Sequence, residues 1–121
     1  MPDIVDVWIE KAKQDERVSR LIEAAGEPLT LAAYHLQQAA EKRIKARLVR
    51  AGVKPKKTHD LVALATDLSV DLPDTILECL TSLSILAWTT RYPGFEIKDE
   101  TDYREILSDY QNLVVWLEGL A

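Results

Sequence analysis

The chain has 121 residues and a net charge of −5, with 47% apolar and 29% charged residues. This length fits one domain, placed at residues 1–121, and the composition is too apolar for a disordered protein. The N-terminal stretch Met1-Pro2-Asp3-Ile4-Val5-Asp6 has acids where a signal peptide has basic residues, and no apolar run reaches membrane-spanning length. The single cysteine, Cys79, excludes an intrachain disulfide. We therefore expect a cytoplasmic protein without membrane contact.

Prolines and glycines divide the chain into amphipathic pieces, and the first two predict helices over residues 3–24 and 29–51. The first helix stops at Gly26 and Pro28, and Gly52 closes the second. Both have apolar residues at helical spacing, which we expect to form a core. These positions are Ile4, Val7, Trp8, Val18 and Ile22 in the first helix, and Leu29, Ala33, Leu36, Ala40, Ile44, Leu48 and Ala51 in the second.

Three further helices are predicted. Thr58 is the expected N-cap and Asp60 a first-turn acid of a short helix that ends near Val70. The next helix begins at Leu72-Pro73-Asp74 and terminates at Arg91-Tyr92-Pro93-Gly94. Since no segment alternates with period two, the fold class is all-α, an up-and-down bundle of four to five helices. The last helix follows Asp99 and continues almost to the C-terminus. The expected core positions of these three helices are, in turn, Leu61, Leu64, Ala65 and Leu68; Ile76, Leu80, Leu83, Ala87 and Trp88; and Tyr103, Ile106, Tyr110, Leu113, Leu117 and Leu120.

Basic residues concentrate between positions 42 and 57. This segment contains no acid and carries a charge of +8, so the remainder carries −13. A local basic zone on an acidic body attracts phosphates, although such a run can equally be a solvated helix face. The basic residues are Lys42, Arg43, Lys45, Arg47, Arg50, Lys54, Lys56 and Lys57.

Charged residues interrupt the apolar stripe of the first helix. Lys11 and Asp15 are one turn apart in the same sector as the apolar residues. We expect an ion pair at the edge of the bundle, and ligand contact is the alternative.

The second helix shows the same pattern. Gln37 lies within its stripe, Arg47 beside it and Glu41 at its border. We expect Gln37 to brace a neighbouring helix through hydrogen bonds and Glu41 to pair with Lys45 one turn later. The polar residues that lie away from the stripe are expected to face solvent, a second subunit or a bound anion; they are His35, Gln38, Lys42 and Lys45.

Three motifs follow one another along the chain: Tyr34-His35-Leu36-Gln37-Gln38-Ala39-Ala40-Glu41-Lys42, Lys57-Thr58-His59-Asp60-Leu61 and Arg91-Tyr92-Pro93. With Trp8, Ala12 and Asp15 in a first helix of the right length, they resemble the HEPN (higher eukaryotes and prokaryotes nucleotide-binding) domain over nearly the whole chain. The resemblance implies a bundle of four or five helices that usually dimerises. Some members bind nucleotides, many are encoded beside a minimal nucleotidyltransferase, and a subset are ribonuclease toxins held in check by that partner.

The ribonuclease members resemble one another in an Arg-x(4–6)-His motif, in which histidine serves acid-base chemistry and arginine stabilises phosphate charge. This chain has two histidines, His35 and His59, with fourteen and eight residues between each and its nearest upstream arginine. Arg91 is the best counterpart of the family's arginine, but no histidine follows it. Catalysis would require His59 to substitute from another helix. Its simpler role is packing or capping beside Thr58.

The leading hypothesis is a noncatalytic module that binds a nucleotide or an RNA phosphate. It would act as a homodimer with a minimal nucleotidyltransferase, in a toxin–antitoxin-like system, and it needs no cofactor or metal. Arg91 offers a guanidinium for phosphate and Tyr92 a ring for a base, although both are also compatible with a helix stop whose tyrosine packs on the bundle. The candidate nucleotide or phosphate contacts are Gln38, Lys42, Lys45, His59, Arg91 and Tyr92, and the polar face of the first two helices comprises Lys11, Asp15, Gln37, Glu41 and Arg47.

Two alternatives remain at this point. The second hypothesis is a purely structural domain, which serves dimerisation or partner binding and whose polar helix residues are interhelical braces. The third hypothesis is a metal-independent ribonuclease toxin.

Overall fold

The computed structural model describes residues 3–97 and 99–120, and within them it contains five helices and no strand. In chain order these are α1 (Ile4–Ala24), α2 (Leu29–Arg50), α3 (Leu61–Thr66), α4 (Asp74–Thr89) and α5 (Glu100–Glu118). This confirms the predicted all-α bundle. None of the helices in this part of the chain is both long and apolar enough to cross a membrane.

The helix ends follow local sequence chemistry. Gly26 and Gly52 each follow the C-cap residue of α1 and α2, with φ angles of 72° and 78°, a left-handed conformation that glycine adopts without a steric cost. The predicted N-cap of the third helix is wrong. Asp60 caps α3 instead of Thr58, because its carboxylate accepts hydrogen bonds from two N–H groups of the first turn. This helix also ends at Thr66, earlier than predicted.

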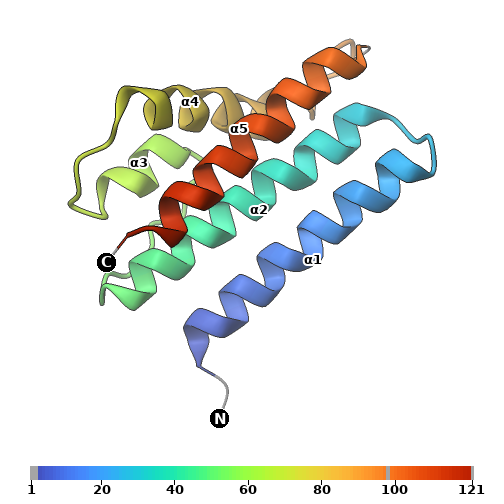
Figure 1. Ribbon diagram of the computed structural model, residues 1–121. Coiled ribbons are helices and arrows are strands. Elements are labelled where there is room, and N and C mark those ends of the chain that lie inside the picture. The colour runs from blue at the N-terminus through green and yellow to red at the C-terminus, as the bar shows by residue number, and fades with distance from the viewer. Residues whose placement is uncertain (1–2, 98, 121) are drawn as a thin grey trace.

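Helix α2 is the centre of the bundle, with α1 on one side and α4 and α5 on the other (Figure 1). It packs against α1, α3, α4 and α5. A helix with neighbours around most of its circumference has no broad solvated face, so its polar residues cannot be divided into inward and outward groups from the sequence. Its buried residues are Ala32, Ala33, Leu36, Gln37, Ala39, Ala40, Glu41, Arg43, Ile44, Ala46 and Leu48.

The core confirms most of the predicted apolar positions, including Ile76, Leu80, Leu83 and Ala87 of α4 and Tyr103, Tyr110, Leu113 and Leu117 of α5. Three predicted core residues are exposed instead: Ile4, Ala51 and Trp88. Each lies at or near a helix end, where the neighbouring helices no longer cover it. Trp88, in the last turn of α4, is 58% exposed.

Candidate functional site

Asp15 of α1 is buried against α2 and binds two of its side chains. Its Oδ1 atom lies 2.9 Å from His35 Nδ1, and its Oδ2 atom accepts a hydrogen bond of 2.5 Å from Lys42 Nζ. The predicted pair with Lys11 is wrong, since Lys11 is exposed and Asp15 faces the neighbouring helix. His35 and Lys42 were expected to point away from the bundle, and they lie against α1.

Glu41 of α2 repeats this arrangement with the other histidine. Its Oε1 atom lies 2.7 Å from His59 Nδ1, and its Oε2 atom accepts from Lys45 Nζ at 3.3 Å. The predicted pair of Glu41 and Lys45 is confirmed. Lys45 Nζ also lies 5.6 Å from the centre of the Trp8 ring on α1, so it does not face open solvent as expected. His59 therefore docks on α2 rather than capping the helix beside Thr58.

Arg43, which the sequence did not single out from the basic run, joins three helices. It is buried, its Nη2 atom lies 2.8 Å from Glu16 Oε1 of α1, and its Nε atom donates to Tyr110 Oη of α5 at 3.1 Å. Its Nη1 atom is 3.6 Å from Glu118 Oε1. Burial by itself lowers the pKa of Arg43, but the hydrogen bond and the attraction to Glu16, with Tyr110 adding to them, raise it on balance. Burial also raises the pKa of Tyr110.

The predicted brace at Gln37 is wrong. Gln37 is fully buried, but its Oε1 atom accepts from Gln38 Nε2, on the same helix, at 2.7 Å. Its Nε2 atom has no hydrogen-bond partner among the described residues. Arg47 does connect two helices, because its Nη2 atom donates to the backbone oxygen of Leu120, just beyond α5, at 3.1 Å.

The basic segment is thus divided. Five of its eight basic residues bind protein groups: Lys42, Arg43, Lys45, Arg47 and Lys56, the last at 3.2 Å from Asp67. The other three form no ion pair with any described residue, and all are exposed: Arg50, Lys54 and Lys57.

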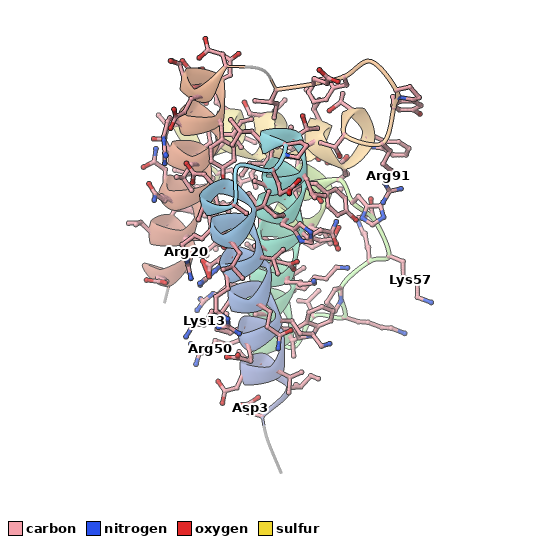
Figure 2. The ribbon with its side chains drawn as sticks, turned by 90° about the vertical axis from the view of Figure 1, so that its right-hand side faces the viewer. Asp3, Lys13, Arg20, Arg50, Lys57 and Arg91 are labelled. Carbon is pink, nitrogen blue, oxygen red and sulfur yellow. The ribbon has the colours of Figure 1, made fainter. Side chains whose placement is uncertain are left out.

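Arg91 lies beside a hollow of about 380 Å³ between the start of α2 and the end of α4. The hollow is also lined by Thr30, Leu31 and Tyr34. Arg91 is exposed and forms no ion pair within the described part of the chain. In Figure 2 it lies on the same edge of the molecule as Lys57. Tyr92, which follows it, is 62% exposed rather than packed on the bundle.

Apolar side chains are exposed next to this hollow. Ile85, Trp88 and Tyr92 follow one another at helical spacing along the outer side of α4 and just beyond it, and they are 51%, 58% and 62% exposed. Leu31, which lines the hollow, is 47% exposed. Four large apolar residues are thus exposed on the outer side of α4, just beyond α4 and at the start of α2.

Other site chemistry finds little support in the described residues. Among them, no group of three His, Cys, Asp or Glu side chains is placed to hold a metal ion. The Cys79 thiol lies 3.7 Å from Asp109 Oδ1, and burial, with the nearby Asp109 charge, raises its pKa to about 11. A thiol with this pKa is protonated at neutral pH and is a poor nucleophile.

A protein-family model described as HEPN domain matches residues 5–120. Among solved structures, the chain is similar to TT1696 from Thermus thermophilus, with 24% identity, a TM-score of 0.81, and coverage of 94% of this chain and 95% of the other. It is also similar to ST0689, described as an archaeal HEPN homologue, with 28% identity, a TM-score of 0.73, and coverage of 98% of both chains. A search of curated proteins found no match.

Proposed function

Because the chain belongs to the HEPN domain family, we propose that it is a noncatalytic module that recognises the phosphate of a nucleotide or of RNA at the Arg91 hollow. The observation that carries this proposal is the position of Arg91, an exposed guanidinium without an ion pair among the described residues, at the rim of a hollow of about 380 Å³. Guanidinium groups bind phosphate oxygens through paired N–H donors.

The start of α2 supports phosphate binding at the same place. Its N-cap residue is Pro28, which provides no side-chain hydrogen bond to the first turn, and Pro28 lines the hollow together with Thr30 and Leu31. The N-terminus of a helix carries a partial positive charge and N–H groups that need acceptors. An anion held by Arg91 would therefore gain from this helix end as well.

Aromatic side chains at the hollow provide rings on which a nucleotide base can stack. Tyr34 lines it, and the exposed ring of Tyr92 follows Arg91 in the chain. Stacking of a base on an aromatic side chain is worth about 1–3 kcal/mol and requires no particular base. We accordingly assign phosphate recognition to Arg91 and base stacking to Tyr34 or Tyr92. Lys57, on the same edge of the molecule as Arg91 (Figure 2), is a further candidate. His59 is a weaker one, because it already contacts the Glu41 carboxylate.

Lys42 and Lys45 are weaker candidates than the sequence indicated. Each already binds a carboxylate, Lys42 that of Asp15 and Lys45 that of Glu41. A phosphate would have to compete with these ion pairs, whereas Arg91 has none to lose among the described residues.

Nucleotide titration tests the proposal. AMP, ATP and a 5′-phosphorylated RNA oligonucleotide are added to the purified protein, and binding is followed by calorimetry and by the melting temperature. A bound ligand at one hundred times its Kd stabilises a protein by about 2.7 kcal/mol. We expect Arg91→Ala to weaken binding at least tenfold and Arg20→Ala, at an exposed arginine of α1, to leave it unchanged. Absence of binding for all three ligands, or full binding by Arg91→Ala, would contradict the proposal.

In the cell, we propose that the module works as a homodimer beside a minimal nucleotidyltransferase, in a toxin–antitoxin-like system. This part rests on the family resemblance and leads to two measurements. Light scattering should give twice the monomer mass, and the gene next to this one should encode a nucleotidyltransferase whose product copurifies with the protein. A monomer at all concentrations would contradict the proposed homodimer, and the absence of such a neighbouring gene would contradict the proposed partnership. Neither result would bear on the proposed ligand binding at Arg91.

The exposed apolar residues of α4 favour a second candidate function, a purely structural dimerisation or partner-binding module. Large exposed apolar groups that follow one helix face are typical of protein interfaces. Trp88→Glu should then produce a monomer in light scattering, while Leu21→Glu, at an even more exposed apolar residue of α1, should not. If self-association depends on Trp88 and no nucleotide binds, this second function replaces the first.

A further inference from the structure

Gln37 occupies a core position of α2 although its side chain is polar. It is fully buried, and its Nε2 atom has no hydrogen-bond partner in the part of the chain that the structure describes. An N–H group that is buried without an acceptor lowers the stability of a protein, and an apolar side chain of similar size would avoid this cost. A buried amide of this kind therefore needs an explanation other than packing.

A hydrogen bond connects Gln37 to the next residue. Its Oε1 atom accepts from Gln38 Nε2 at 2.7 Å. Gln38 is only partly buried, and its side chain forms no other hydrogen bond with a described residue. A primary amide has two N–H donors and an oxygen acceptor. Gln38 therefore has one N–H group and its oxygen left for a ligand, and the bond to Gln37 holds both in one orientation.

Gln38 lies one helical turn beyond Tyr34, which lines the Arg91 hollow. Residues four apart are neighbours on one face of a helix, about 5–6 Å apart. A base that stacks on Tyr34, in a nucleotide whose phosphate binds Arg91, would extend its polar edge toward Gln38. We propose, on the basis of the proposed function, that Gln38 recognises adenine at this position and that Gln37 is the residue that positions the Gln38 amide.

The chemistry of an amide favours adenine over guanine. The amino group of adenine, a donor, has an acceptor ring nitrogen on each side, so an amide matches either edge of this base. Guanine offers a matching donor and acceptor only on its base-pairing edge, and in the reverse order. An amide that turns freely would match both bases. The amide of Gln38, held by Gln37, matches adenine and opposes guanine.

Recognition at Gln38 involves no available charge. Lys42, one turn further along α2, is bound to Asp15, and Lys45 is bound to Glu41. The contact with the base is therefore neutral, whereas the contact of a phosphate with Arg91 is ionic and is screened by salt. Salt should weaken the binding of all nucleotides by a similar factor and leave the preference for adenine unchanged.

The test is a calorimetric titration of the protein with AMP, GMP and ribose 5-phosphate, which has the phosphate and no base. We expect AMP to bind at least tenfold more tightly than either of the other two. Gln38→Ala should reduce the ratio of the GMP and AMP dissociation constants to within threefold of one. Gln14→Ala, at an exposed glutamine of α1, is the matched control and should leave the ratio unchanged.

Gln37→Leu tests the positioning role. It removes the acceptor that holds the Gln38 amide and replaces a buried, unsatisfied group by an apolar one, so the variant should keep the fold, checked by its melting temperature. We expect AMP to bind within about threefold of its original affinity and GMP to approach it. A merely structural role of Gln37 would change stability without changing this ratio.

Failure of this role differs from failure of the proposed function. Equal binding of AMP, GMP and ribose 5-phosphate, or a preference for AMP that survives Gln38→Ala, would overturn base recognition and leave phosphate binding at Arg91 intact. A preference that survives Gln37→Leu would overturn the positioning role. No binding of any of the three ligands would overturn the proposed function, and base recognition with it.

Discussion

The positive charges of residues 42–57 fall into two regions with different surroundings. In the middle of α2, Lys42 and Arg43 bind carboxylates of α1. At the end of α2 and beyond it, Arg50 and Lys57 form no ion pair with any described residue. The first region therefore stabilises the bundle, whereas the second keeps its charge available for an external anion.

This difference shows that a run of basic residues in a sequence does not indicate which of its charges remain available to bind an external anion. Two adjacent acids of α1, Asp15 and Glu16, face the middle turns of α2 and take up its cations. At the last turn of α2, Arg50 has no such partner among the described residues. Four substitutions test the contrast, and they follow from the largest expected effect to the smallest.

Removal of the Arg43 side chain should have the largest effect. Arg43→Ala leaves Glu16 without its cation and the buried Tyr110 hydroxyl without its donor. Breaking a buried ion pair by removing one partner costs about 3–5 kcal/mol. We expect a loss of about 3 kcal/mol in the free energy of unfolding, measured by urea denaturation with far-UV circular dichroism. A loss below about 1 kcal/mol would contradict the stabilising role of this region.

Asp15→Ala should have the second largest effect, because it removes the shared acceptor of His35 and Lys42. A buried group left without its hydrogen bond costs about 1–3 kcal/mol. We expect a loss of about 2 kcal/mol in the same urea measurement. Lys11→Ala is the control, and we expect it to change stability by less than about 0.5 kcal/mol, as exposed positions generally do. Equal losses in the two variants would instead support the ion pair of Lys11 and Asp15 that the sequence predicted.

His59→Ala should cost about 1 kcal/mol, since it removes one hydrogen bond to Glu41 while Lys45 remains bound to that carboxylate. The substitution also tests catalysis. The purified protein is incubated with RNA in EDTA, and we expect no cleavage by either the natural chain or the variant. Cleavage that His59→Ala abolishes would make His59 a catalytic residue and overturn the noncatalytic proposal.

Lys57→Ala should have the smallest effect, within about 0.5 kcal/mol, because Lys57 is exposed and has no ion pair among the described residues. Lys42→Ala provides the contrast, with an expected loss of about 1 kcal/mol from its bond to Asp15. Both are measured in one denaturation series. Indistinguishable values would remove the distinction between the two regions.

Most of the fold follows from local patterns in the sequence. The apolar spacing of α4 and α5 predicted buried residues such as Leu83 and Leu113, and Gly26 and Gly52 marked the helix ends. The errors occur where coverage by another helix decides burial. Trp88 has the spacing of a core residue but lies in the last turn of α4, where it is exposed.

The candidate site was predicted less well, for a geometric reason. The pair of Glu41 and Lys45 lies within one helix, so spacing alone predicted it. The partners of Asp15, by contrast, are 20 and 27 residues away in the chain. Because residues 42–57 contain no acid, nothing in the sequence distinguished Arg43 from the other seven basic residues of this segment. Its contacts with Glu16 and Tyr110 gave no signal in the sequence.

By itself, the sequence determined the helical class, the approximate bounds of the helices and most of the core, because these depend on residues within a few turns of one another. Only the tertiary structure decided which charges are paired. The reason is that α1 can meet α2 in many rotations about its axis, and the packing of the whole bundle selects one. That rotation brings Asp15 to His35 and Lys42, and it leaves Arg50 without an ion pair among the described residues.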